Sequence, residues 1–267
     1  MPDLATLTFA GVPFEVRIDP ARPAYFLYGI RKSGSSIMNA MVTSLARMND
    51  VHYVDVAGRL FEKGVGVGTW QKDPGLGDLI RGGNVYGGFR NAPLGIKDHP
   101  VARASRSVLL VRDPRDALVS EYFSNAYSHS IPPEGEARDQ MLQQRADALR
   151  ASIAEYVLRM APNFRNTLRE YIPFLQHPHL RLYQYERAIL DKRWFLRDLC
   201  DHYGWSVSDT QLGHILGWAD VMPEEENPTQ FVRKVRPGDH LDKLDPATIA
   251  RLNEILGDGL RLLRYDA

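Results

Sequence analysis

The segment from residue 25 to residue 36, YFLYGIRKSGSS, most constrains what this chain can fold into. It begins as a short apolar strand, passes through a loop between Gly29 and Gly34, and ends in hydroxyl residues. Apolar residues then recur at helical spacing, which predicts a helix over residues 35–48. Backbone N–H groups and the dipole at a helix N-terminus favour an anion. The segment therefore predicts a phosphate- or sulfate-binding loop, and the alternative is an ordinary Gly-rich turn with a solvated Lys32.

This loop differs from the common nucleotide-triphosphatase loop, G-x-x-x-x-G-K-[ST], in which Lys directly follows the second Gly. Gly29 and Gly34 have the required separation, but Ser35 stands in the place of that Lys. The basic residue, Lys32, lies inside the loop instead. We therefore expect an anion site of a different kind.

A second segment, SVLLVRDPRD from residue 107, has the pattern of a buried parallel strand followed by a helix. Pro114 fits the first turn of that helix, where its missing N–H costs nothing. Arg112 would leave the carboxyl end of the strand, where ligands bind in open α/β sheets. Its planar fork of donors suits phosphate, and Ser120 could face the same anion. The alternative is that Arg112 and Asp113 only cap the strand end and pair there.

Four motifs in order resemble those of the sulfotransferases that use 3′-phosphoadenosine 5′-phosphosulfate (PAPS). The family's Y-P-K-S-G-T-T-W resembles IRKSGSSI at residues 30–37, and R-[ND]-P-[RK]-D-x-x-V-S-x-Y resembles RDPRDALVSEY at residues 112–122. An apolar run leading into Y-E resembles LYQYE at residues 182–186. F-x-R-K-G-x-x-G-D-W resembles FVRKVRPGDH at residues 231–240.

The resemblance implies a PAPS co-substrate, no required metal, and roles for individual residues. The 5′-phosphosulfate would be held by Lys32, Ser33, Gly34, Ser35 and Ser36. The 3′-phosphate would be held by Arg112 and Ser120, with help from Arg233 and Lys234, and Tyr185 would lie near the adenine.

The chain departs from the family pattern at several of these positions. Arg31 replaces the usual Pro, which either loosens the loop or adds an anion contact. Ile37 replaces the Trp that commonly stacks on adenine, so stacking must come from elsewhere or be weaker. Val235 and His240 replace the Gly and Trp of the last motif.

A general base is needed to activate a hydroxyl acceptor. The segment LGIKDHP at residues 94–100 resembles the K-T-H-x-P segment of the hydroxyl-directed members, which makes His99 the expected base. Lys97 would stabilise transition-state charge, and Lys32 the leaving phosphate. The alternatives are that His99 only packs or caps a turn, or that a carboxylate, Asp55 or Glu62, acts as the base.

Composition narrows the class of protein. The 267 residues have a formal net charge of zero, which gives no case for nucleic-acid binding. The one cysteine, Cys200, excludes an internal disulfide and a cysteine-rich metal site. No apolar run approaches the ~20 residues of a membrane helix, and no signal peptide is evident. We therefore expect a cytoplasmic enzyme of unspecified oligomeric state.

We expect one three-layer α/β domain over residues 1–267, with a central parallel sheet, the P-loop-like phosphate-binding loop and added helices. Residues 1–23 would form an N-terminal arm containing a small hairpin, and the Pro-containing segment 221–241 would form a loop over the donor. The Gly-rich segment 64–88 predicts an acceptor-side loop or a plain surface loop. The aromatic residues of this region either stack on a sugar or anchor the loop: Trp70, Tyr86 and Phe89.

The sequence therefore predicts sulfuryl transfer from PAPS to an acceptor hydroxyl, with a slight preference for a carbohydrate or glycolipid. The alternative acceptor is a small-molecule alcohol or phenol. Two other functions stay open: a P-loop kinase that uses ATP, and a nucleotide-binding module without catalytic activity.

Overall fold

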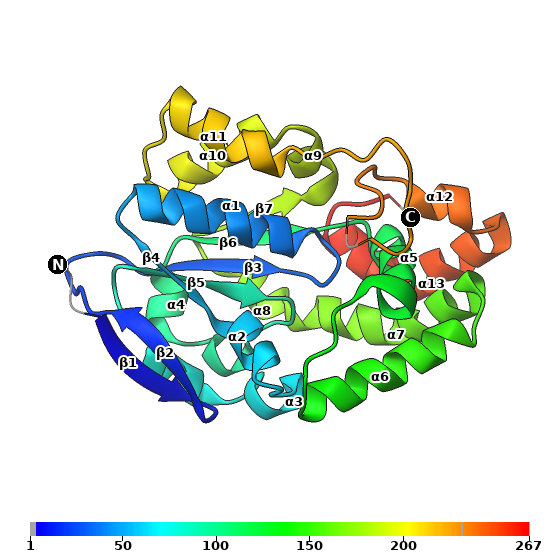
Figure 1. Ribbon diagram of the computed structural model, residues 1–267, viewed down its shortest axis with the longest axis horizontal. Helices are drawn as coiled ribbons and strands as arrows, with labels where there is room; N and C mark the ends of the chain where they lie inside the picture. The colour runs from blue at the N-terminus through cyan, green and yellow to red at the C-terminus, as the bar shows by residue number, and fades with distance from the viewer. Residues whose placement is uncertain (1–3, 231, 267) are drawn as a thin grey trace.

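A computed structural model describes residues 4–230 and 232–266 of the chain, and its centre is a parallel sheet with helices on both faces (Figure 1). The strand order is β4-β5-β3-β6-β7, and each neighbouring pair is parallel. This confirms the predicted three-layer α/β fold. The strands of this sheet are β3 (Tyr25–Gly29), β4 (His52–Asp55), β5 (Asn84–Phe89), β6 (Ser107–Val111) and β7 (Leu180–Gln184).

In the first half of the chain the helices connect the strands, whereas the second half consists mainly of helices. The first half has α1 (Ser35–Met48), α2 (Val56–Glu62), α3 (Val67–Trp70), η1 (Pro74–Leu79), η2 (Leu94–Ile96), α4 (Pro100–Ala104), α5 (Pro114–Phe123) and the π-helix η3 (Ser124–Ser128). The second half has α6 (Glu136–Leu149), α7 (Ile153–Glu170), α8 (Ile172–Leu175), α9 (Tyr185–Leu190), α10 (Lys192–Tyr203), α11 (Asp209–Ala219), α12 (Asp239–Lys243) and α13 (Pro246–Leu262).

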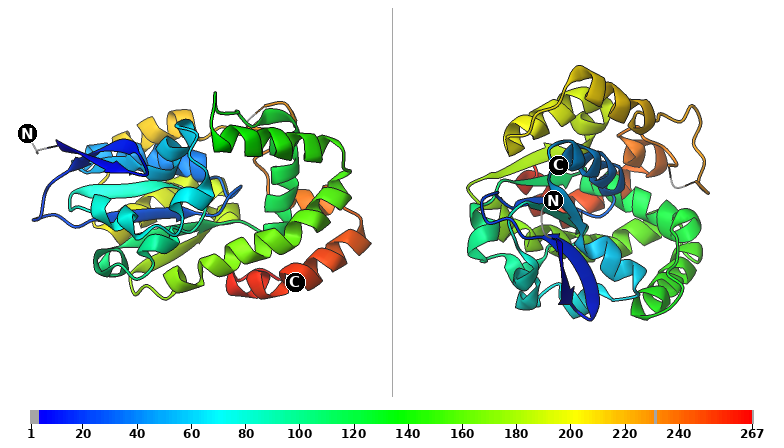
Figure 2. Two further views of the ribbon diagram at one scale, coloured as in Figure 1. Left: turned by 90° about the horizontal axis from the view of Figure 1, so that it is seen from below. Right: turned by 60° about the vertical axis from the view of Figure 1, so that its left-hand side comes forward.

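The central strand β3 shows why the sheet is buried on both faces. Alternate residues of a strand point to opposite faces. Tyr25 and Leu27 pack in the core beneath α1, α10 and α11, whereas Phe26 and Tyr28 pack in the core formed with α5, α7 and α13. Figure 2 shows these two helical layers on either side of the sheet. A continuous apolar run such as 25–28 is what such a strand requires.

The order of the strands places two predicted motifs at one edge. From β3 the chain goes to β4 and β5 on one side, and then crosses to β6 and β7 on the other. Ligands in open α/β folds bind at such a switch point, beyond the carboxyl ends of the strands. The loop after β3 and Arg112 after β6 both lie at this carboxyl edge.

The N-terminal arm contains the expected hairpin, formed by β1 (Leu4–Phe9) and β2 (Val12–Arg17). Its two turn residues, Ala10 and Gly11, have φ of 49° and 75°. Positive φ at both central residues characterises the tight hairpin turns whose twist matches that of the strands.

The Gly-rich segment 64–88 is more regular than expected. It contains α3 and η1, and residues from Asn84 onward form β5, which lies between β3 and β4. Glycines in this strand hid it from pattern analysis, yet Gly87 is needed because any Cβ there would collide with the Tyr53 side chain. Its aromatic residues are 1–2% exposed, so they anchor the fold and cannot stack on a sugar: Trp70, Tyr86 and Phe89.

The described chain ends in one long helix, α13, over residues 246–262. Its Gly259 fits against Leu168 of α7, where a side chain would collide. Close packing between the two helices therefore keeps the glycine within the helix.

A buried hydrogen bond fixes the end of β3, because the Tyr171 hydroxyl donates to the Gly29 carbonyl at 2.9 Å. We predict that Tyr171→Phe lowers the free energy of unfolding by about 1–2 kcal/mol, since it removes this bond in the core. Urea denaturation followed by circular dichroism measures it. Tyr28→Phe is the matched control, since the Tyr28 hydroxyl is buried with no partner among the described residues. Equal losses in the two variants would contradict the prediction.

Candidate functional site

The loop after β3 presents an uncapped helix N-terminus. Gly34 is the N-cap of α1 in the left-handed conformation, with φ of 83°, and no side chain caps the helix. Lys32 also has a positive φ, 66°. The N–H groups of the first turn are therefore left for an anion.

Backbone and side-chain bonds hold the loop in place. Ile30 donates its N–H to Leu110 of β6, and Arg31 donates its N–H to Arg90, which directly follows β5. The Ser33 hydroxyl is buried and donates to the Ile30 carbonyl at 2.6 Å. Ser33 therefore stabilises the loop from within, while the backbone at Gly34, Ser35 and Ser36 remains at the helix terminus.

Lys32 lies within a group of cations. Burial lowers the pKa of the Lys32 amine, and the positive charges of Arg112, Arg90 and Arg233 lower it further. The negative charge of Glu121 opposes this, and the resulting pKa is about 8. Such crowding of like charges indicates a site built for an anionic ligand.

Arg112 forms the second part of the site. Its guanidinium stacks on the Tyr185 ring at 4.6 Å, lies 3.6 Å from Asp116 and contacts the Lys32 carbonyl at 3.4 Å. Its Nε is buried and has no partner among the described residues. A buried N–H without a partner costs free energy, so this donor suits an anionic acceptor. Ser120, half-buried two turns along α5, follows Arg112 and Asp116 at helical spacing.

A small apolar cluster adjoins the loop at the position where the family has Trp. It consists of Tyr185, Ile189 and Val235, with Ile37 packed against them. The Tyr185 ring rests on Gly34 so closely that a Cβ there would lie 2.9 Å from it. Tyr185 also donates its hydroxyl to the Val235 carbonyl at 2.8 Å. The structure thus places Tyr185 beside the loop and shows which apolar residues surround Ile37.

The last motif is held to α5 by Asp116. The Asp116 carboxylate accepts hydrogen bonds from the Gly238 N–H at 2.7 Å and from the His240 N–H and ring at 2.9 and 2.6 Å. Burial opposes ionisation of Asp116, but these bonds and Arg112 lower its pKa to about 2. His240, which stands where the family has Trp, is therefore held in place by Asp116. Phe231, the first residue of this motif, lies outside the described residues.

Arg233 and Lys234 reach the site already paired with carboxylates. Arg233 is buried between Glu226 and Asp239, with its guanidinium 4.2 Å from the Phe123 ring centre. Lys234 pairs with Asp239 at 3.0 Å and Asp242 at 2.8 Å. Both cations therefore belong to a network of ion pairs beside the site.

The Arg31 side chain is engaged by residues of α5 and α7. Its guanidinium donates to Glu121, Thr167 and Asn163 at 3.0–3.1 Å. It also lies 4.8 Å from the Phe164 ring centre. The Arg31 side chain therefore ties the loop to α5 and α7, and its guanidinium is occupied by these partners.

The structure does not bring His99 to the loop. His99 precedes α4 and packs against Gly77 of η1, and its Nδ1 is buried without a partner among the described residues. Lys97 pairs with the exposed Asp98, and its carbonyl accepts from His177, which precedes β7. Figure 1 shows α4 and α5 at opposite ends of the sheet. The crossover to β6 carries this segment toward the amino edge, about 16 Å from the carboxyl edge for a five-residue strand.

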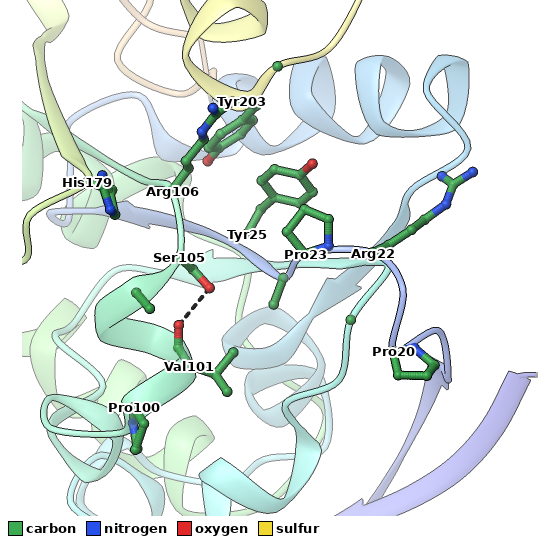
Figure 3. A pocket seen from close by; sticks show the side chains of 14 residues that line it. Pro20, Arg22, Pro23, Tyr25, Pro100, Val101, Ser105, Arg106, His179 and Tyr203 are labelled. Carbon is green, nitrogen blue, oxygen red and sulfur yellow. Dashed lines mark hydrogen bonds between the residues drawn. The ribbon is translucent and has the colours of Figure 1, made fainter.

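A hollow of about 970 Å³ lies at that amino edge. Figure 3 shows Tyr25, Arg106 and His179 lining it, and they lie at or just before the starts of β3, β6 and β7. The anion site is at the other end of these strands, so the hollow is separate from it.

Of the two carboxylates weighed as bases, Asp55 lies at the carboxyl edge. It ends β4 and caps α2 by accepting the Gly58 N–H at 3.0 Å. Burial raises the pKa of the Asp55 carboxyl and Glu62 adds to the rise, although the Gly58 N–H and Arg90 oppose it.

Sequence reasoning missed two residues of this edge. Arg90 directly follows β5, donates to the Ser36 hydroxyl at 3.2 Å and has no ion pair with a described carboxylate. An Arg at the end of a strand is the signal in the sequence, but the Gly-rich pattern of residues 64–88 predicts a loop where β5 lies. His129 follows the π-helix η3, and the charges of Lys32 and Arg90 both act on it. No sequence pattern places a π-turn, so nothing in the sequence pointed to His129.

Two negative observations complete the picture. The described part of the chain has no group of three or more His, Cys, Asp or Glu side chains arranged to hold a metal ion. Within residues 4–230 and 232–266, no helix has the length and apolar character needed to cross a membrane.

Lys32 should reduce the stability of the fold at neutral pH. Its pKa is near 8 in the folded chain against 10.5 normally. Protonation therefore disfavours the folded state, fully below pH 8 and less as the pH rises toward 10.5. We predict that Lys32→Met raises the free energy of unfolding by about 2–3 kcal/mol at pH 7, with a smaller gain at pH 10. Denaturant titrations at both pH values measure this, with the exposed Lys63→Met as control. A pH-independent difference would contradict the prediction.

Solved structures of sulfotransferases are similar to this chain. A solved structure of mouse sulfotransferase SULT7A1, complexed with PAP, is similar over 96% of this chain and 94% of that one, with a TM-score of 0.61 and 13% identity. A sulfotransferase from Alicyclobacillus acidocaldarius has a TM-score of 0.45 and 16% identity, over 92% and 98% of the two chains. The sulfotransferase domain of the Synechococcus PCC 7002 olefin synthase has 0.37 and 14%, over 94% and 97%. No protein-family model and no curated protein sequence matches the chain. The structural likeness to the mouse protein confirms the sulfotransferase fold expected from the motifs.

Proposed function

We propose that this protein is a sulfotransferase that moves a sulfuryl group from PAPS to an acceptor hydroxyl. The observation that carries the proposal is a pair of anion sites at one edge of the sheet. One is the N-terminus of α1 with Lys32, and the other is Arg112; within residues 4–230 and 232–266, no side chain caps that helix and no group pairs with the buried Arg112 Nε. PAPS carries anionic groups at both its 5′ and 3′ positions. The mouse protein of the same fold was solved with PAP.

In this proposal each anionic group of the donor has its own residues. The 5′-phosphosulfate lies at Lys32, Gly34, Ser35 and Ser36, with Arg90 added on the β5 side. The 3′-phosphate lies at Arg112 and Ser120, which Arg233 and Lys234 support by their charge. The adenine lies against Tyr185 and the apolar cluster around Ile37, which supplies contact area in place of a Trp.

The chemistry requires electrostatic stabilisation more than covalent help. The acceptor oxygen bonds to sulfur as the bond from sulfur to the 5′-phosphate oxygen breaks, and charge gathers on the equatorial and leaving oxygens. Fixed cations in a partly desolvated site stabilise that charge. Lys32 and Arg90 flank the loop where it develops.

The acceptor is a hydroxyl compound in this proposal, without preference for a carbohydrate. The aromatic residues that favoured a sugar are core residues, so a small-molecule alcohol or phenol fits equally well. Cytoplasmic location stays a prediction from the sequence.

A kinase that uses ATP is the second candidate, favoured by the P-loop-like position of the loop between β3 and α1. It leaves Arg112 without a ligand, because ATP has no 3′-phosphate. The two candidates therefore differ in what they predict for nucleotide binding.

We predict that adenosine 3′,5′-bisphosphate binds at least 10-fold more tightly than adenosine 5′-phosphate, since charge-assisted hydrogen bonds contribute about 1.5–3 kcal/mol. Isothermal titration calorimetry measures both affinities. Arg112→Ala should reduce the preference to about 2-fold or less, and Arg112→Lys keeps the charge if the alanine variant is unstable. Equal binding of the two nucleotides by the unchanged protein would refute the proposal and favour the kinase.

Arg90 gives a complementary prediction. Arg90→Gln should weaken both nucleotides by a similar factor, roughly 10-fold, because its partner is the shared 5′-phosphate. Arg103→Gln, on the exposed face of α4, is the control and should bind as the unchanged protein does. Loss of the 3′-phosphate preference in Arg90→Gln would show that the two sites are assigned wrongly.

A further inference from the structure

Resting on the proposed function, we infer that His129 is the base that takes the proton from the acceptor hydroxyl. The expected base, His99, lies at the other edge of the sheet. His129, by contrast, is close enough to Lys32 and Arg90 for both of their charges to act on it.

The fold places His129 by an unusual turn. The π-helix η3 continues α5, and the His129 N–H donates to the Ser124 carbonyl five residues back, at 2.8 Å. The Arg145 guanidinium holds the His129 carbonyl at 2.6 Å. The ring meets Phe61 of α2 edge-on, with centroids 6.0 Å apart. Turns of this kind are rare and often occur at functional sites. Here the turn directs the chain from α5 toward the helix that follows β4.

The segment after His129 packs beside the end of α2. It runs to Gly135, which lies against the backbone of Gly64 just after α2, and Ala137 donates its N–H to the Gly64 carbonyl. His129 therefore contacts α2 on one side, through Phe61, and is close enough to the loop for the charge of Lys32 to act on it.

The hydrogen bonding of the ring defines its tautomer. Nδ1 lies 3.0 Å from the Ser130 carbonyl oxygen. A carbonyl can only accept, so Nδ1 carries the hydrogen and Nε2 keeps its lone pair. The ring is half-buried, and Nε2 is the atom able to take a proton.

The surroundings keep the ring neutral before reaction. Burial lowers the pKa of His129, and Lys32 from the loop, Arg90 after β5 and Arg145 from α6 lower it further. The bond to the Ser130 carbonyl opposes them, and Phe61 on α2 adds no charge. Neutral imidazole is the form that a general base needs.

With His129 as the base, every proton and electron pair of the sulfuryl transfer is accounted for. Nε2 takes the hydroxyl proton as the acceptor oxygen bonds to sulfur, and the sulfur–oxygen bond to the 5′-phosphate breaks. The leaving adenosine 3′,5′-bisphosphate gains the electron pair of that bond. Its added negative charge, beside Lys32 and Arg90, offsets the cation formed on His129.

The first test needs no acceptor. Histidine ring resonances of the full chain are followed by NMR through a pH titration, with and without adenosine 3′,5′-bisphosphate, and are assigned by His129→Gln and His99→Gln. We expect the nucleotide to raise the pKa of His129 and to leave the His99 resonance unchanged. A His129 resonance that ignores the nucleotide would overturn the inference.

The second test measures turnover with water as acceptor, as release of adenosine 3′,5′-bisphosphate from PAPS. His129→Gln should lower kcat about 100-fold, abolish the rise of rate with pH on the acid side, and leave nucleotide affinity within 2-fold. His99→Gln should change neither. Asp55→Asn, which keeps a residue able to cap α2, separates the carboxylate alternative. A large loss in Asp55→Asn with none in His129→Gln would assign the base to Asp55. Failure of the unchanged protein to bind the nucleotide would instead refute the proposed function.

Discussion

Four cations gather where β3, β5 and β6 end, and their mutual repulsion is the constraint that the neighbouring structure answers. The positive charges of Arg90, Arg112 and Arg233 lower the pKa of Lys32. Each charge brought into a partly buried site costs free energy unless it is paired. The structure leaves Arg90 and Lys32 without a close carboxylate among the described residues. An anionic ligand would remove the repulsion, so the binding energy of such a ligand is prepared in the fold itself.

Buried carboxylates set how far this repulsion goes. Asp116 pairs with Arg112 and also accepts three hydrogen bonds from Gly238 and His240. One side chain thereby joins α5 to the segment that carries Arg233 and Lys234. Glu121 binds Arg31 and turns it away from the loop. The carboxylates of α5 thus pair with some of these cations and tie them to the fold, as Glu121 does with Arg31.

The motifs near the chain's strand–helix junctions were predictable, because local rules govern them. An apolar run, a Gly-bounded loop and a hydroxyl at a helix start specify β3 and α1 without knowledge of the rest of the chain. The same holds for β6, Pro114 and α5. His99 shows the limit of this reasoning. Its sequence context resembles a catalytic motif, but the crossover to β6 carries it toward the amino edge, and sequence distance does not report that path.

The sequence by itself determined the class of fold, the loop between β3 and α1 and the position of Arg112 at a strand end, because each depends on residues adjacent in the chain. The tertiary structure alone decided that Arg31 is structural, that Arg90 joins the site, and that His129 lies near Lys32 (residues 97 apart by number). These depend on how separate elements meet at one edge of the sheet. Glycines in β5 and the π-turn after α5 are tolerated only because neighbouring elements pack against them, and that packing is absent from any local pattern.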